Sequence, residues 1–276
     1  MNVCVVMKNV LLLATAILLA GCAKDIDLEV MKKQSAETIF ASGQKEMKAG
    51  NHNVAVKIFE ELERLHPYSR LNADAQLNAG QCHYTKKRYD EAAAAFAVFV
   101  KTYPTNEKVP YALYMLGKLY YEQMPIVSRD QEQTVLALDY FNELCERYPD
   151  SKYVEDARRK IAELRQHVAG REVYVAMFYQ AHNNYAAAIG RLNTVVELYR
   201  DTEHAPEALH RLVECYVAMG AREEAVKVNK LLQSRHPETS WAGHSRSLLG
   251  MKILGSRQQQ NNSAKSKAKP KKATTR

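Results

Sequence analysis

The sequence predicts an all-α fold of stacked helical hairpins, and three observations lead to this expectation. Only 11 glycines and 8 prolines occur in 276 residues, and 46% of the residues are hydrophobic, as in an ordered helical chain. Apolar residues recur at helical spacing through most of the sequence. Proline follows an aromatic residue or histidine at the end of four amphipathic segments, at His66-Pro67, Tyr103-Pro104, Tyr148-Pro149 and His236-Pro237.

These prolines define a repeat, because proline cannot continue a helix. The separations are 37 residues from Pro67 to Pro104, 45 from Pro104 to Pro149, and 88 from Pro149 to Pro237. The last interval fits two units with one proline missing, and Tyr199-Arg200 stands where that proline would be. Five helical hairpins are therefore expected.

Within each unit, small and large residues occupy the positions of the tetratricopeptide (TPR) pattern. Two helices that cross closely need a small residue at the crossing and a large one beside it; Gly43 with Phe59 and Gly80 with Phe96 have this spacing. No hairpin buries its apolar face alone, so stacking creates a continuous core. The sequence predicts a TPR superhelix of five helical hairpins, in which these residues are structural.

The first 21 residues have the features of an export signal. Lys8 precedes an apolar run from Val10 to Ala20, which is too short to span a bilayer as a helix. The run ends in Leu19-Ala20-Gly21-Cys22, a pattern that resembles a lipobox. We expect a lipoprotein signal peptide over residues 1–21 and lipid attachment at Cys22. An ordinary signal peptide or a buried apolar helix is the alternative.

Four further regions follow along the chain. Residues 22–34 are expected to be a linker, 35–150 to hold repeats 1–3, 151–254 a long helix with repeats 4–5, and 255–276 a disordered basic tail. The long helix is predicted from apolar spacing between residues 152 and 181, either unbroken or broken at Gly170. In the third hairpin, the polar stretch between Met124 and Gln133 exceeds what a turn needs.

The net charge of +8 is concentrated at the end of the chain. Residues 255–276 contain seven cations and no acid, so the folded body is nearly neutral. Such a tail can bind anionic lipid, nucleic acid or polyanionic cell-wall material, although a solvated tail without a dedicated ligand is the simpler interpretation. Because export removes the chain from the nucleoid, nucleic acid is not expected as a partner.

No motif for catalysis, a metal or a cofactor is present in the sequence, so we expect a binding protein and not an enzyme. Once Cys4 and Cys22 are set aside, the odd count that remains cannot pair completely. We expect Cys82, Cys145 and Cys215 to be buried free thiols. The nine histidines are scattered, and solvated or helix-capping roles are expected for them.

The first helix of each TPR hairpin lines the inner face of the stack, and here those positions are aromatic or apolar. Such a face suits an extended or helical peptide. Alternatively, the tyrosines pack on a neighbouring helix or on the N-terminal segment of the chain. The predicted peptide groove comprises Phe40, Met47, Leu77, Tyr84, Tyr111, Tyr114 and Tyr121.

Five short runs, in their order along the chain, resemble the BamD family, the TPR lipoproteins of the outer-membrane β-barrel assembly machinery. The resemblance covers roughly Ser35 to Leu249. The runs are Tyr103-Pro104-Thr105, Tyr111-x-x-Tyr114-Met115-x-Gly117, Arg129-Asp130-Gln131, Tyr148-Pro149-Asp150-Ser151-x-Tyr153 and Tyr185-x-x-Ala188-Ile189-x-Arg191.

The resemblance implies a scaffold anchored by lipid to the periplasmic side of the outer membrane. Its implied partners are the periplasmic domain of BamA, unfolded outer-membrane β-barrel proteins and other lipoproteins of the complex. Arg191 matches a family position that couples to BamA, and Arg129 and Asp130 in the third-hairpin loop are further interface candidates; an exposed Arg191 without a role is the alternative.

Two other functions fit parts of the sequence. One is a TPR protein that coordinates cell-envelope or peptidoglycan processes, resembling the Tol-Pal-associated protein. That family usually has an N-terminal coiled coil, fewer repeats and no lipobox. The other is a peptidoglycan-binding lipoprotein that acts through its lysine-rich tail.

Overall fold

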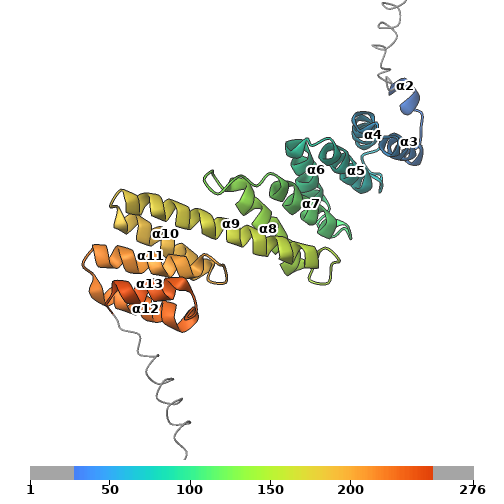
Figure 1. Cartoon of the computed structure of the whole chain (residues 1–276). Helices are drawn as coiled ribbons and strands as arrows, with labels where there is room; N and C mark the ends of the chain where they lie inside the picture. The colour runs from blue at the N-terminus through green and yellow to red at the C-terminus, as the bar shows by residue number, and fades with distance from the viewer. Residues whose placement is uncertain (1–27, 251–276) are drawn as a thin grey trace, which may run out of the picture. The chain divides into compact units, whose positions relative to one another are not determined.

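The computed structural model describes residues 28–250, which form twelve α-helices and no strand (Figure 1). The expected signal peptide, Cys22 and the basic tail lie outside the described residues. The helices are α2 (Leu28–Met31), α3 (Ala36–Lys48), α4 (His52–Leu65), α5 (Asn72–Thr85), α6 (Tyr89–Thr102), α7 (Val109–Glu122), α8 (Glu132–Arg147), α9 (Val154–Ala181), α10 (Tyr185–Leu198), α11 (Ala205–Ala218), α12 (Arg222–Arg235) and α13 (Ser240–Leu248).

The chain divides into two compact units, one up to Leu119 and the other from Tyr120 onward. This boundary lies in the last part of α7, within the third expected hairpin. From the sequence, the N-terminal group of repeats is expected to end at residue 150, so the observed boundary lies earlier in the chain.

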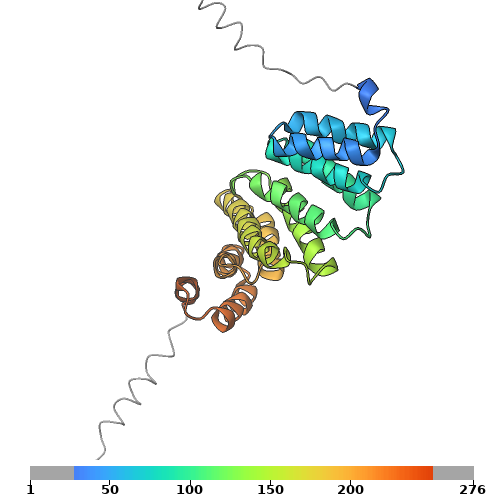
Figure 2. The ribbon, with the colours of Figure 1, turned by 90° about the vertical axis from the view of Figure 1, so that its right-hand side faces the viewer.

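In the first unit, α3 to α6 form two antiparallel hairpins that lie side by side (Figure 2). A Cβ atom added to Gly43 would lie 2.5 Å from Cε1 of Phe59, and one added to Gly80 would lie 3.0 Å from Cε1 of Phe96. Both rings are fully buried. The expected pairing of a small and a large residue at the helix crossings is confirmed.

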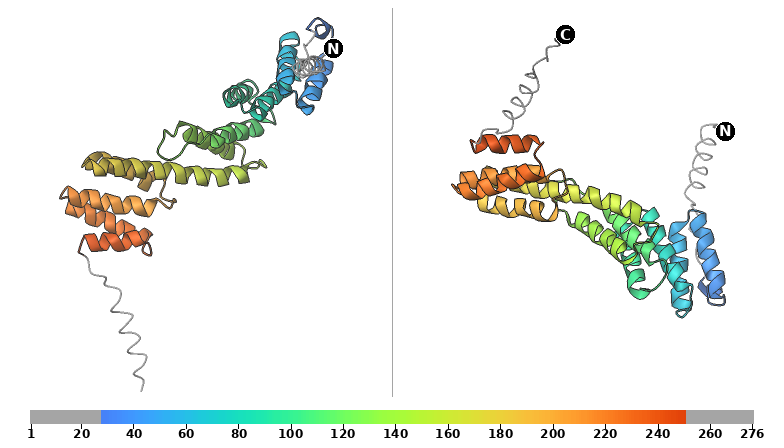
Figure 3. Two further views of the ribbon diagram at one scale, coloured as in Figure 1. Left: turned by 45° about the horizontal axis from the view of Figure 1, so that its top comes forward. Right: turned by 90° about the horizontal axis from the view of Figure 1, so that it is seen from below.

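In the second unit, α9, α10 and α11 pack in succession, and α12 and α13 pack against α11 (Figure 3). The first three helices share one buried cluster, which includes Ala176, Leu192 and Leu212. The helix α9 runs unbroken through Gly170 for 28 residues, so the unbroken alternative of the sequence prediction is confirmed. The short helix α13 was not anticipated as a separate element.

The turns inside the hairpins share one backbone feature. A residue with positive φ follows the first helix of four hairpins, at Gly50 (81°), Lys87 (57°), Asn183 (57°) and Gly220 (75°). Left-handed backbone reverses the chain in few residues. The third hairpin has the longer 123–131 segment instead, and this segment carries part of the candidate site.

Helix ends follow the predicted proline positions. The residue before each proline is the C-cap of α4, α6, α8 or α12, and its amide donates to the carbonyl four residues earlier. Tyr199 caps α10 in the same way, although Arg200 follows it. The missing proline therefore leaves the hairpin intact.

Candidate functional site

Three of the predicted groove residues are buried or half-buried. Phe40 and Met47 on α3 are half-buried and pack against the cluster that contains Phe59, and the rings of Phe40 and Phe59 are 5.8 Å apart. Leu77 on α5 is only 7% exposed. These side chains offer little free surface to a ligand in this arrangement.

The tyrosines on α5 and α7 are half-buried and connect the two helices. Tyr111 donates its hydroxyl to Oε1 of Gln81 and meets the buried Phe96 edge-on, with ring centroids 6.3 Å apart. The Nζ atom of Lys118 lies 5.2 Å from the centre of the Tyr84 ring. Both tyrosines thus contact a neighbouring helix, as the alternative interpretation expected, and keep part of their surface exposed.

Positions 111, 114 and 118 share one face of α7, because they are three and four residues apart. Tyr114 is half-buried between Tyr111 and Lys118 on this face. The structure thus brings Tyr84, Tyr111 and Tyr114 together with an amide and an ammonium group. We call this set, with Gln81 and Lys118, the tyrosine ladder. It offers apolar rings with polar edges, which suit a peptide whose backbone and side chains both need contacts.

Tyr121, the seventh predicted groove residue, belongs to the second unit. Its hydroxyl donates to Oε2 of Glu163, and Nζ of Lys160 lies 5.0 Å from its ring centre. The hydrogen bond to Glu163, with burial, raises the pKa of Tyr121 to about 12. Tyr121 therefore stays protonated and bound to α9.

The segment between α7 and α8 is tied to α9 by Gln131, which is 8% exposed. Its Nε2 donates to the carbonyls of Ile126 and Arg129, at 3.1 and 2.9 Å. Its Oε1 lies 2.8 Å from Nδ1 of His167 and accepts from Thr134. Burial lowers the pKa of His167, so a neutral imidazole that donates from Nδ1 satisfies this contact. The sequence drew attention to this loop but did not reveal the role of Gln131.

Arg129 and Asp130 are exposed on the same loop. The Asp130 carboxylate accepts from the amide of Gln131 at 2.7 Å. Arg191 on α10 is exposed and lies 3.3 Å from the Glu172 carboxylate of α9. It forms no hydrogen bond or ion pair with Arg129 or Asp130, so these interface candidates are separate points on the second unit.

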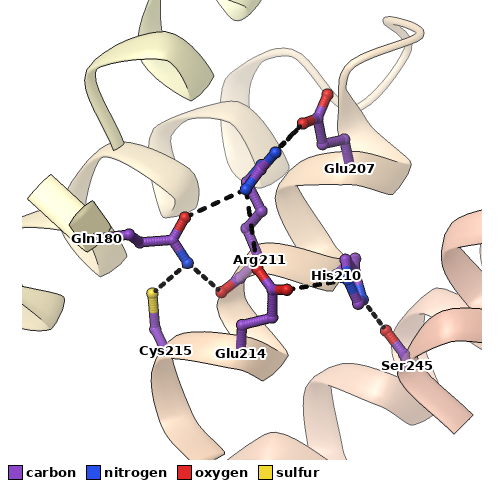
Figure 4. A network of polar contacts seen from close by, with 7 residues as sticks. All are labelled: Gln180, Glu207, His210, Arg211, Glu214, Cys215 and Ser245. Atoms are coloured by element: carbon purple, nitrogen blue, oxygen red, sulfur yellow. Dashed lines mark hydrogen bonds and ion pairs between the residues drawn. The ribbon is translucent and has the colours of Figure 1, made fainter. Parts of the chain in front are cut away.

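A polar network joins α9, α11 and α13 (Figure 4). His210 is 7% exposed; its Nδ1 lies 2.7 Å from Oγ of Ser245, and its Nε2 lies 3.3 Å from Oε1 of Glu214. The hydrogen bond with His210 is the largest effect that lowers the pKa of Glu214. The expectation of solvated or capping histidines is therefore wrong for His210, which lies inside a helix and is buried.

This serine, histidine and glutamate are not arranged for nucleophilic catalysis. Ser245 is fully buried, so no substrate reaches its hydroxyl. Arg211 extends the network on the exposed side, 2.7 Å from Glu207 and within 3.5 Å of Gln180 (Figure 4). The network fastens α13 to α11. Among residues 28–250, no group of three or more histidine, cysteine or acidic side chains could hold a metal ion.

The chain matches the model of a known protein family. The model of the YfiO family, described as an outer membrane lipoprotein, matches residues 32–231. The chain belongs to this family. The match covers the tyrosine ladder, the 123–131 loop and Arg191, and it stops before α13.

Two curated relatives that share one name support the same family assignment. "Outer membrane protein assembly factor BamD" of Caulobacter vibrioides is 37% identical over 237 residues, which cover 86% of this chain and 77% of that protein. The protein of that name from Rickettsia prowazekii is 30% identical over 234 residues, covering 85% of this chain and 93% of that protein. The chain is thus a member of the YfiO/BamD family along most of its length.

Among solved structures, the TPR protein YrrB is 18% identical and has a TM-score of 0.36, covering 77% of this chain and 92% of that chain. At this level the similarity does not bear on function. Within residues 28–250, no helix combines the length and the apolar character that crossing a membrane requires.

Proposed function

We propose that this protein is an outer-membrane protein assembly factor that acts by binding polypeptides. The observation that carries the proposal is the family match over residues 32–231, joined to 37% identity with a curated assembly factor. The described fold supports it, because stacked hairpins present faces for polypeptides and the serine-histidine pair is buried.

Attachment to the membrane is the first part of the proposed mechanism. Lipid on Cys22 would hold the protein on the periplasmic side of the outer membrane. Tethering raises the local concentration of partners that share the same surface. The scaffold then needs only modest affinity for each of them.

The tyrosine ladder is the proposed site for unfolded β-barrel proteins. Its rings provide apolar area at a low cost in side-chain entropy, and their hydroxyls hydrogen-bond at the edge. The Lys118 ammonium beside Tyr84 adds positive charge, which favours a segment that ends in an aromatic residue and the chain-terminal carboxylate.

The second unit is the proposed site for the periplasmic domain of BamA. Arg191 is held by the largely buried carboxylate of Glu172, which fixes its position on α10. A guanidinium has five donors, so Arg191 can bind a partner's carboxylate while it keeps Glu172. Arg129 and Asp130 would add contacts from the loop.

A peptide-binding experiment tests the substrate site. A fluorescent peptide that ends in phenylalanine is titrated with the full mature chain and with the Tyr84→Ala and Tyr114→Ala variants. Loss of one contact aromatic is expected to weaken binding by about tenfold. Tyr68→Ala is the matched control, because Tyr68 is 99% exposed in the same unit. Equal affinity in all four proteins would overturn the assignment of the groove.

A capture experiment tests the partner site separately. Immobilised BamA periplasmic domain should retain the wild type and lose most of Arg191→Glu, since the reversed charge also repels Glu172. Lys230→Glu makes the same change of charge at an exposed lysine on α12 and should be retained. Undiminished capture of Arg191→Glu would remove Arg191 from the interface.

A further inference from the structure

An open pocket of about 420 Å³ lies in the second unit, and the proposed function does not use it. Its walls come from α9, from the 123–131 loop, from the turn that precedes α11 and from the first turn of α11. Tyr174 and Met177 line it with 50% and 42% of their surface exposed. Val127 and Val173 add apolar wall. Apolar surface of this kind, collected in a hollow, indicates a place where another polypeptide segment packs.

The pocket is acidic. Glu163, Glu203 and Glu207 line it, and its lining includes no lysine or arginine. Glu163 accepts a hydrogen bond from Tyr121, and Glu207 is paired with Arg211, while the exposed Glu203 contributes its amide, not its carboxylate, to the contact with Gln166. The occupant that fits these walls therefore carries positive charge on side chains with long apolar stems.

Arg171 lies at the edge of this pocket and is already engaged. Its Nη1 donates to the carbonyl of Ser128 at 2.9 Å, and its guanidinium lies 5.9 Å from the centre of the Tyr174 ring. It holds the loop side of the wall in place. The opposite side, at Glu203, carries the uncompensated negative charge.

The chain itself contains a segment with the matching chemistry. Residues 255–276 carry seven cations and no acid, and five of these are lysines between residues 265 and 272. We propose that this C-terminal segment binds in the acidic pocket, with lysine ammonium groups at Glu203 and lysine stems over Tyr174 and Met177.

The reach of the chain permits this contact. The described part ends beside the start of α12, where Arg222 donates to the carbonyl of Leu249; the pocket lies at the other end of α11, which is 14 residues long and so about 21 Å. The sixteen residues from Gly250 to Lys265 can extend over as much as about 50 Å. Because the segment is tethered, its effective concentration at the pocket is in the millimolar range.

Salt screens the lysine–glutamate attraction, so the segment should occupy the pocket less at high ionic strength. When bound, the segment covers an apolar surface that would otherwise be exposed in the free protein.

Site-specific photo-crosslinking in the purified full chain tests the proposal. A benzophenone amino acid replaces Met177 in the pocket, and in the control it replaces Leu198, which is 59% exposed on α10. Mass spectrometry of the monomer is expected to find crosslinks from position 177 to residues 255–276 and few from position 198. Crosslinks to a second copy, or equal yields at both positions, would overturn the proposal.

Charge variants identify the cause of the contact. The yield from position 177 should fall about threefold or more in Glu203→Lys, in the chain with the five lysines between 265 and 272 changed to glutamine, and in high salt. Glu197→Lys changes an exposed glutamate outside the pocket and should leave the yield unchanged. A yield that ignores Glu203→Lys would also overturn the proposal, and folding of each variant is confirmed by its helical circular dichroism.

Discussion

A single missing methyl group decides how closely α3 and α4 approach each other. Gly43 faces the ring of Phe59, which is 1% exposed and cannot move aside. The sequence predicted this contact, because both residues belong to a repeated pattern and the next unit has the same pair at Gly80 and Phe96. Residues of this kind can be placed from the sequence, since their role repeats in every hairpin.

Gly43→Ala should destabilise the protein by about 1–3 kcal/mol, because a Cβ atom 2.5 Å from Phe59 forces apart a packed core. Gly190→Ala is the matched change in α10, where a Cβ atom meets nothing within 4 Å. It should stabilise by about 0.5–1 kcal/mol through helix propensity. Urea unfolding followed by circular dichroism measures both. Opposite signs are expected, and a shared sign would contradict the packing explanation.

The residues that the sequence did not reveal act through distant partners. His210 bonds Ser245, and Gln131 bonds His167, each across about 35 positions of the chain. The expectation for a scattered histidine was a solvated side chain, and only the packing of three helices shows otherwise. The acidic pocket escaped prediction for the same reason, because its glutamates come from α9, from the turn before α11 and from the first turn of α11.

Among the elements, α9 shows why a glycine does not always break a helix. Gly170 lies near the middle of its 28 residues, and glycine costs about 1 kcal/mol relative to alanine in such a place. A Cβ atom there would lie 3.0 Å from Nε2 of His204. Because glycine has no side chain, the turn before α11 can lie close to α9 at this point, and α9 stays unbroken. The spacing of apolar residues alone could not decide between an unbroken and a broken helix.

The short helix α13 was missed because nine residues give little periodic signal. Thr239 caps its first turn, and Ser245 fastens it to His210. Ser245→Ala should destabilise this helix by about 1–2 kcal/mol, because it leaves a buried imidazole nitrogen without a partner. Hydrogen exchange should quicken in residues 240–248, and Ser247→Ala, at an exposed position, should leave it unchanged. If both variants exchange alike, the hydrogen bond does not hold α13.

At the scale of the whole molecule, periodicity alone indicated an all-helical repeat protein, and the described helices confirm it. The five hairpins, their proline-marked ends and the long helix could be predicted because each follows from local spacing. The candidate groove could be predicted only as a set of positions. Whether Phe40 and Leu77 face a ligand or a core depends on how far neighbouring hairpins rotate, and side-chain volumes set that rotation.

No disulfide bond joins cysteines within the described residues. Cys82, Cys145 and Cys215 are free, as expected, and two of them are fully buried while Cys145 is half-buried. They lie on α5, α8 and α11, so their reactivity reports on separate hairpins of both units. Burial raises the pKa of all three, and that of Cys82 reaches about 11.

These thiols should therefore resist modification until the hairpins open. At pH 8 a disulfide reagent should label Cys82 and Cys215 far more slowly than a free thiol, because the thiolate is the reactive form. The folded state keeps the Cys82 proton where the unfolded chain loses it, so this contribution to stability is complete below pH 9 and declines as the pH rises from 9 to about 11. The rate of labelling in a pH series, with Cys82→Ser as the control, shows the pH at which Cys82 becomes a thiolate in the folded protein. Rapid labelling of Cys82 at pH 8 in the folded protein would mean that α5 opens without unfolding, and the tight core beneath Gly80 would not exist in solution.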